Sequence, residues 1–304
     1  MHAVFENDVV LRTLINCLAS SPFDGPFNYV GHHAPAALVA LRMVCRRFME
    51  HCEPVFWRKI ILRGANLKEG VKFLRNRGHF VHYVVLCADS FTVDGETLQA
   101  LPEIRPVAVV WTWRDRLLPM RSWRSCKESL LLLQAWKHSA TELFLNAIPL
   151  RKHLPDLVDF KNVTALVLAD YFPDCESDIP RLLRQLPDLQ YLELHTDIRP
   201  HGLPSLTDCG SVLRNIRVLH VFRCSASIFT SLVDCRSLRD MWVTLQAAPT
   251  SGEWATAQRV LARNQALRRI EVTWLTGIPP SDLVGAERAI QGLFPSANVH
   301  IGFF

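Results

Sequence analysis

The cysteines and histidines are the residues best suited to chemistry, but their spacing matches no common catalytic or metal site. Nine cysteines are present, and no two of them are at C-x-x-C spacing. Most fall in apolar stretches, where a free thiol behaves as a small buried hydrophobe. His32 and His33 are adjacent but have no cysteine pair nearby, which does not favour zinc. The sequence therefore predicts a reduced compartment, no disulfide framework and no metal site.

The motifs of common enzymes are also missing from the sequence. It contains no G-x-S-x-G elbow, no G-x-x-x-x-G-K-S/T phosphate loop and no G-x-G-x-x-G fingerprint. The Asp and Glu residues are scattered and form no recognisable acid–base pair. We therefore predict a protein without catalytic residues or cofactors, and an enzyme is only the third alternative. A catalytic cysteine, which would need exposure and an activating base, stays open.

A basic, tryptophan-rich segment at residues 111–127 is the other feature with chemical potential. Arginine and tryptophan together can stack on bases and neutralise phosphates, and they can also bind an acidic substrate tail. The interpretation we prefer is a strand edge and an inserted loop with partly buried tryptophans. The net charge of +5 is modest and the arginines are interspersed with acids, so nucleic acid is not favoured as a partner.

Composition indicates a folded protein outside the membrane. Of the 304 residues, 49% are hydrophobic and 21% are charged, as in ordinary globular proteins. The N-terminus lacks the basic start and long apolar core of a signal peptide. The most apolar runs, residues 107–113 and 130–133, are far shorter than the roughly 20 residues that cross a bilayer. We predict a cytoplasmic or nuclear location and no membrane partner.

The first region, residues 1–62, is predicted to be a small helical module. Asp8 is a suitable helix start, and an apolar stripe at spacings of three and four follows it: Val10, Leu11, Leu14, Ile15 and Leu18. Residues 20–34 contain prolines and glycines and read as a loop. A second helix is expected from near Pro35, with one apolar face formed by Leu38, Leu41, Val44 and Cys45. A third stretch, broken at Pro54, reaches Trp57 and precedes a short extended run at residues 60–62.

The second region, residues 63–304, changes to a repeated strand–helix rhythm. Segments of the form apolar-x-x-apolar-x-apolar lie at residues 81–86, 163–168, 189–194, 216–221, 238–243 and 267–272, with weaker copies at 106–109, 140–145 and 296–301. The central residues recur within the roughly 20–29 residues of a leucine-rich repeat, except between Val107 and Leu143, which implies an insertion or a missed repeat. Helix-like stretches lie at residues 178–186, 228–235, 254–264 and 281–293.

This rhythm predicts an α/β fold with parallel strands on one face and helices on the other. Alternate strand side chains point toward the helices. No single repeat can bury its apolar face, so the array is stable only as a stack. An irregular leucine-rich-repeat solenoid is the predicted architecture, and a doubly wound α/β sheet is the alternative.

The segment LVALRMVCRRF, residues 38–48, resembles the second half of the F-box motif, in which an apolar helix leads to a Val-Cys-Arg/Lys-x-aromatic signature. The likeness continues through residues 54–60, and residues 5–11 resemble the opening helix of the motif. Glu6 stands where the family usually has proline, and the loop 20–34 is longer than the usual connection. The resemblance implies an F-box module, followed here by the irregular repeats.

The resemblance also implies a docking function. F-box proteins bind the Skp adaptor of Skp–cullin–F-box ubiquitin ligases, and the adaptor ties them to cullin, the RING protein and the ubiquitin-conjugating enzyme. Their C-terminal repeats hold a protein substrate, which raises the effective concentration of its lysines near activated ubiquitin. On this basis the residues expected in the module core and the adaptor-facing surface are Leu14, Leu18, Leu38, Leu41, Val44 and Trp57, and the alternative is that all six simply form the core.

The expected substrate surface is the face of the strands that points away from the helices. Its residues should line up in rows across neighbouring strands. One row holds Val167, Glu193, His220, Trp242 and Glu271, and the next holds Ala169, His195, Phe222, Thr244 and Thr273. Aromatic residues beside charges are typical of protein-binding surfaces. The predicted substrate contacts are His195, His220, Phe222 and Trp242, and the alternative is that these are exposed strand residues without a partner.

These observations together predict a non-catalytic, substrate-recognition adaptor of a Skp–cullin–F-box ubiquitin ligase, which acts in ubiquitin-dependent degradation. The alternative function is a leucine-rich-repeat interaction scaffold with no ubiquitin role. The sequence identifies neither the protein substrate nor its degradation signal.

Overall fold

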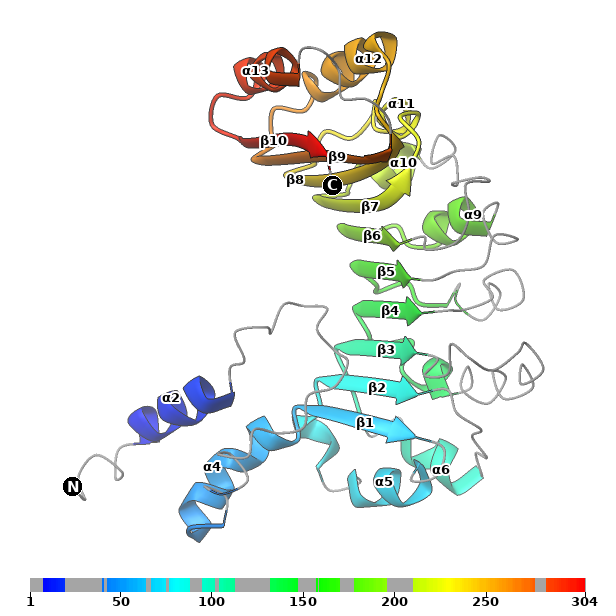
Figure 1. Cartoon of the computed structure of the whole chain (residues 1–304). Coiled ribbons are helices and arrows are strands. Elements are labelled where there is room, and N and C mark those ends of the chain that lie inside the picture. The colour runs from blue at the N-terminus through cyan, green and yellow to red at the C-terminus, as the bar shows by residue number, and fades with distance from the viewer. Residues whose placement is uncertain are drawn as a thin grey trace. The chain divides into compact units, whose positions relative to one another are not determined.

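The computed structural model of the chain has two compact units, Met1–Ala140 and Thr141–Phe304. It describes residues 8–19, 40, 43–63, 67–74, 77–87, 95–101, 104–112, 132–146, 157, 159–169, 178–195, 210–276 and 283–303. Each unit is α/β, and the strand pairs described within each unit are all parallel (Figure 1). The predicted α/β class is therefore confirmed, whereas the domain boundary after residue 62 stays a prediction.

The first unit combines a helical pair with three described strands. Its elements are α2 (Asp8–Ala19), α4 (Arg46–Phe56), β1 (Lys59–Arg63), α5 (Leu67–Leu74), η2 (Gly78–Phe80), β2 (Tyr83–Cys87), α6 (Gly95–Ala100) and β3 (Ala108–Thr112). The strand order is β1-β2-β3, with Ile60 beside Val84 and Val84 beside Val109. The centre of β3 is thus Val109 and not Val107, which corrects the repeat position taken from the sequence.

Helices α2 and α4 pack against each other around a small apolar core. Leu11, Ile15 and Cys52 are almost fully buried, and Phe48, Val55 and Phe56 pack against them. At the start of α2, the Asp8 carboxylate accepts a hydrogen bond of 2.7 Å from Arg47 Nη2 and lies 3.1 Å from His51 Nε2. The apolar stripe predicted for residues 10–18 therefore does hold a helix to its neighbour, through its members Leu11 and Ile15.

Two details of the predicted helices in this region are wrong. Val44 lies in a turn and Cys45 is the extended N-cap of α4, so neither belongs to the preceding helix. Pro54 does not break the following helix but lies inside α4. It removes the one hydrogen bond its N–H would donate, and the packing of the next residues, Val55 and Phe56, against the core offsets that loss.

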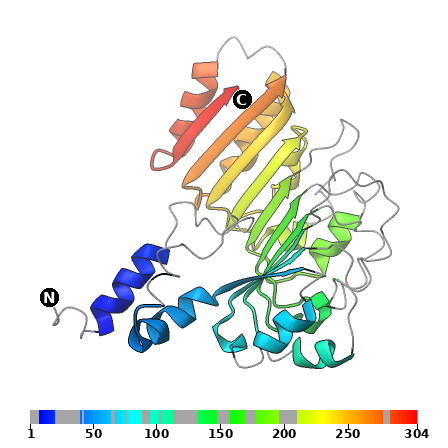
Figure 2. The same ribbon diagram turned by 60° about the horizontal axis from the view of Figure 1, so that its bottom comes forward.

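The second unit is a series of parallel strands with helices on one side of them (Figures 1 and 2). Its elements are β4 (Glu142–Asn146), β5 (Ala165–Ala169), α9 (Asp178–Arg184), β6 (Tyr191–His195), α10 (Gly210–Leu213), β7 (Val218–Cys224), α11 (Ile228–Ser231), β8 (Asp240–Ala247), α12 (Ser251–Leu261), β9 (Arg269–Thr276), α13 (Leu283–Leu293) and β10 (Asn298–Phe303). The strands follow one another in chain order across the sheet. One face of each strand supplies the core, as Leu192 and Leu194 of β6 illustrate, since neither has any exposed surface.

Seven of the described strands begin with the same pair of hydrogen bonds, here called the strand-entry hydrogen bonds. The N–H groups of Arg217 and Val218 both donate to the carbonyl of Gln190, and those of Arg239 and Asp240 both donate to the carbonyl of Arg217. The same pattern begins β2, β3, β5, β6 and β9. It places the neighbouring strand starts in one register along the unit.

All nine segments of the repeated pattern are confirmed as strands, but each of these strands begins two residues later than predicted. The first apolar residue of each pattern is buried before the strand starts. Leu189, for example, donates its N–H to Leu186 in a turn. The four predicted helical stretches are also found. Helix α12 starts at Ser251 because Thr250 and Glu253 form a capping box, with Glu253 N 3.3 Å from Thr250 Oγ1 and Thr250 N 2.7 Å from Glu253 Oε2.

The small core between α2 and α4 makes a direct stability prediction. Replacement of Leu11 by Ala should lower the free energy of unfolding of this unit by about 2–4 kcal/mol, because a fully buried leucine is lost and a cavity remains. Leu14→Ala on the same helix is the matched control, and it should change this free energy by about 0.5 kcal/mol or less because Leu14 is exposed. Urea unfolding of both variants measures the difference, and equal effects would contradict the packing described.

Candidate protein-interaction surfaces

The register of the strands places the predicted rows side by side on the outer face, which is the side of the sheet that points away from the helices. Glu193 pairs with His220, His220 with Trp242 and Trp242 with Glu271. In the next row His195 pairs with Phe222, which pairs with Thr244. The alignment of the rows is therefore confirmed. The role of His195, His220, Phe222 and Trp242 in binding a substrate stays a prediction.

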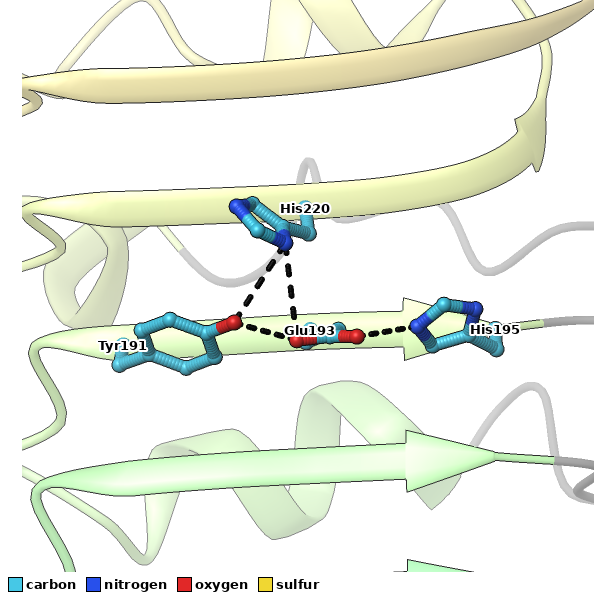
Figure 3. Close-up of polar contacts among 4 residues, drawn as sticks. All are labelled: Tyr191, Glu193, His195 and His220. Carbon is cyan, nitrogen blue, oxygen red and sulfur yellow. Dashed lines mark hydrogen bonds and ion pairs between the residues drawn. The ribbon is translucent and has the colours of Figure 1, made fainter. Parts of the chain in front are cut away.

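Three side chains on β6 and β7 converge on the carboxylate of Glu193, and we call the four residues the Glu193 cluster: Tyr191, Glu193, His195 and His220 (Figure 3). The Glu193 carboxylate accepts hydrogen bonds from the Tyr191 hydroxyl and from His195 Nε2. His220 Nδ1 lies 3.5 Å from Glu193 Oε2 and 3.4 Å from the Tyr191 hydroxyl. Glu193 is only 9% exposed, so these contacts largely replace water around its charge.

The cluster keeps Glu193 ionised in spite of its burial. Burial raises the pKa of this carboxyl group, but the hydrogen bonds with His195, His220 and Tyr191 outweigh that effect and hold the pKa well below its usual range. A fixed negative charge therefore lies at this point of the outer face. Two of the groups that stabilise it, His195 and His220, are predicted substrate contacts.

Trp242 lies beside the cluster between two other side chains. The His220 ring meets the Trp242 ring edge-on, with centroids 4.0 Å apart and planes at 72°. The Arg269 guanidinium lies over the Trp242 ring at 4.5 Å from its centroid, and its Nη2 is 3.5 Å from Glu271 Oε2. Such cation–π and edge-to-face contacts hold the indole in one orientation. These contacts pre-arrange the charged and aromatic groups around Trp242 on the outer face.

A bulge in β7 brings a second arginine to this surface. The pairing of β7 with β8 shifts between Phe222 and Cys224, and the intervening Arg223 has a φ of 61°. A left-handed backbone is uncommon for a residue with a side chain. The guanidinium carbon of Arg223 lies 5.5 Å from the centroid of the Phe222 ring. The centroids of the His195 and Phe222 rings are 6.0 Å apart. Bulges often redirect a side chain near a functional surface.

The predicted adaptor-binding residues fall in different environments. Leu14 on α2 is 39% exposed, and Val44 in the turn before α4 is 65% exposed. Trp57 is half-buried, with its ring 4.8 Å from that of Phe56 and the Arg77 guanidinium 5.7 Å from its centroid. Leu38, Leu41 and the side chain of Leu18 lie outside the described residues. The structure thus brings Leu14 and Val44 to the surface and shows Trp57 packed against neighbouring side chains.

Two further kinds of chemistry concern the described residues: the reactivity of the thiols and the binding of metal ions. Burial raises the pKa of Cys224 and that of Cys235 to about 12, so both thiols stay protonated at neutral pH and are poor nucleophiles. Within the described ranges, no group of three or more His, Cys, Asp or Glu residues is arranged to hold a metal ion. What the Glu193 cluster and its neighbours provide is a set of fixed charges and aromatic rings at a surface.

The sequence analysis missed part of this surface. It placed Glu193 in a row without assigning it a role, and it overlooked Tyr191 and Arg269. The alternation Tyr-x-Glu-x-His in β6 contained a usable signal, because residues two apart on a strand share a face. The position of Arg269 over Trp242 depends on the orientation of a long side chain and has no comparable pattern in the sequence.

Comparisons with known proteins do not extend this description. A scan against protein-family models found no matching family, and a search of curated proteins found no matching sequence. Among the helices that the structure describes, none is both long and apolar enough to cross a bilayer.

Replacement of Glu193 by Gln should reveal the low pKa of this carboxyl group. At neutral pH the variant should lose about 1–3 kcal/mol of unfolding free energy, because hydrogen bonds to a charged, buried group are weakened. A carboxyl group with a lowered folded-state pKa stabilises the fold fully above its unfolded-state pKa, and that stabilisation disappears as the pH falls toward the folded-state pKa. The difference between wild type and Glu193→Gln should therefore shrink below about pH 4.5.

Urea unfolding of both proteins at a series of pH values measures this difference. Glu271→Gln, a half-buried carboxylate in the same row, is the control and should show a much smaller effect. A difference that is independent of pH would show that Glu193 is not held ionised by its neighbours.

Proposed function

We propose that the chain is a substrate-recognition adaptor of a Skp–cullin–F-box ubiquitin ligase. In this proposal the N-terminal helices form an F-box-like module, and the strands and helices that follow form an irregular leucine-rich-repeat array. The observation that carries it is the apolar surface left on α2, on α4 and on the turn before α4, in the region of the chain that resembles the F-box motif.

Several large apolar side chains of this region are exposed although the two helices already share a core. Val9 is 72% exposed, Met43 82% and Val44 65%, and Val10, Leu14 and Met49 are exposed as well. Six exposed apolar side chains on so small a module support a partner that covers them. An adaptor that packs against helices is the partner the resemblance implies.

The strand–helix units support the second half of the proposal. Recurrent strand-entry hydrogen bonds, parallel pairing in chain order and helices on one side are the features expected of stacked repeats. The outer face then offers its aligned side chains to a protein substrate. Rigid aromatic rings beside charges, as at Trp242 and Arg269, are the type of residue that dominates the energy of protein interfaces.

The adaptor contact is tested by the double variant Leu14→Asp and Val44→Asp. It should abolish co-purification with the Skp adaptor, because two charged groups would have to be buried against the partner's apolar surface. The thermal unfolding temperature should change little, since both side chains are exposed in the free protein.

The matched control is Val233→Asp in the second unit, where Val233 is 39% exposed, the same fraction as Leu14. This variant should bind the adaptor normally. If the wild-type protein does not bind the Skp adaptor at all, the adaptor proposal is wrong, and an interaction scaffold without a ubiquitin role becomes the better account.

The substrate surface is tested by the double variant Phe222→Ala and Trp242→Ala. It should lose the proteins that the wild type captures, while adaptor binding is retained, because the two rings lie on the outer face and contribute little to the core. Leu275→Ala, a half-buried residue near the end of β9, is the control. Quantitative mass spectrometry of captured proteins is the measurement, and an unchanged set from a folded double variant would contradict the assignment.

A further inference from the structure

Arginines occupy one structural position in three consecutive strands of the second unit. Arg217, Arg239 and Arg268 are each the last residue before a strand, namely β7, β8 and β9. The corresponding position before β4, β5 and β6 holds Thr141, Thr164 and Gln190, and before β10 it holds Ala297. Within the second unit the arginines at this position are therefore confined to these three strands, and in the first unit Arg58 holds the same position before β1.

The strand-entry hydrogen bonds make these arginines direct neighbours. The Arg239 N–H donates to the Arg217 carbonyl at 2.7 Å, and the Arg268 N–H donates to the Arg239 carbonyl at 2.7 Å. Adjacent strands are about 4.8 Å apart. Three guanidinium groups thus begin from backbone positions spaced at that interval along one edge of the sheet, where β7, β8 and β9 lie side by side (Figure 1).

More arginines flank this row, and we call the whole set the arginine strip: Arg214, Arg217, Arg236, Arg239, Arg263 and Arg268. All six are exposed. To the described residues, none of the six side chains makes a hydrogen bond or an ion pair. Arg269, the residue after Arg268, differs from these six because its guanidinium lies over the Trp242 ring and near the Glu271 carboxylate.

Such a row does not stabilise the unit by itself. Like charges on adjacent strands repel one another. The nearby acids Asp234 and Asp240 form no described ion pair with the strip. A row of exposed guanidinium groups is, however, well suited to a partner with several anionic groups, since each planar fork can bind a carboxylate or phosphate with two parallel hydrogen bonds.

We propose that the arginine strip binds an acidic polypeptide segment, a run of Asp and Glu side chains on a partner protein. The backbone positions of the strip are spread over the turns that lead into three neighbouring strands, which matches many single charges better than one phosphate group. On an extended peptide, carboxylates on one side repeat at about 6.6 Å, a spacing that flexible arginine side chains standing about 4.8 Å apart can meet.

Nucleic acid fits this surface less well. Binding to single strands combines phosphate contacts with open aromatic faces on which bases stack. The aromatic rings nearest in sequence are already covered, because Arg269 lies over Trp242 and Arg223 over Phe222.

The proposal concerns the edge of the sheet at which the strands begin, and it is independent of any link to ubiquitin.

The test compares the full chain with the variant Arg217→Gln, Arg239→Gln and Arg268→Gln. The probe is a fluorescein-labelled oligoglutamate peptide, and its affinity is measured by fluorescence anisotropy at low and at physiological ionic strength. We expect the variant to bind about tenfold more weakly, because it loses three exposed charge-assisted contacts, and we expect salt to weaken wild-type binding.

The matched control removes three exposed arginines from helices of the same unit: Arg181→Gln, Arg259→Gln and Arg288→Gln. It has the same net charge as the strip variant and should bind like wild type. Equal losses in the two variants would overturn the proposal in favour of general charge attraction. Tighter binding of a phosphoserine peptide or of single-stranded RNA than of oligoglutamate would overturn the choice of partner. If the strip variant unfolds, Arg239→Gln alone replaces it and should show a smaller loss in the same direction.

Discussion

The strand-entry hydrogen bonds are the constraint on which the rest of the second unit depends. The carbonyl of the residue just before a strand, such as that of Arg217 before β7, accepts from two successive N–H groups at the start of the next strand, and in this unit the pattern recurs at the starts of β5 to β9. This arrangement fixes where each strand begins, and a slip of one residue would turn every core side chain toward solvent. The same register sets the outer face, because it decides that Glu193 lies opposite His220 and Trp242 opposite Glu271. The surface chemistry is thus a consequence of the core register.

Much of this fold can be predicted from the sequence because strands and helices leave different periodic patterns. All nine strand segments and the alignment of the outer rows follow from alternation alone. The strand starts cannot be predicted in this way, because an apolar residue such as Leu189 is equally well buried when it lies in the turn before the strand. The start of α12 was predictable from Thr250 and Glu253, whereas the continuation of α4 past Pro54 depends on packing. For the Glu193 cluster, the alternation Tyr-x-Glu-x-His places Tyr191, Glu193 and His195 on one face of β6, whereas the contact with His220 depends on side-chain orientations that no sequence pattern records.

The outer face shows how one buried charge can organise a surface. Burial of the Glu193 carboxylate is unfavourable unless donors replace water, and Tyr191, His195 and His220 supply them. In return, the carboxylate orients both imidazole rings. The orientation of His220 in turn places its ring edge-on to Trp242, whose other contact is Arg269. A partner would therefore meet side chains that are already ordered, and less conformational entropy would be lost on binding.

The apolar surface of the first unit and the arginine strip of the second unit differ in chemistry. Both, however, are energetically unfavourable in the isolated protein. Val44 and Met43 expose apolar area that folding of the free chain leaves in water, and the strip holds like charges near one another without described counter-ions. Neither arrangement is explained by the stability of the isolated protein. A partner that covers the apolar surface of the first unit, and an acidic polypeptide that binds the arginine strip of the second unit, would each remove this energetic cost. Because the two surfaces differ in chemistry, such partners would not substitute for each other, and mutation of one surface should leave binding at the other intact.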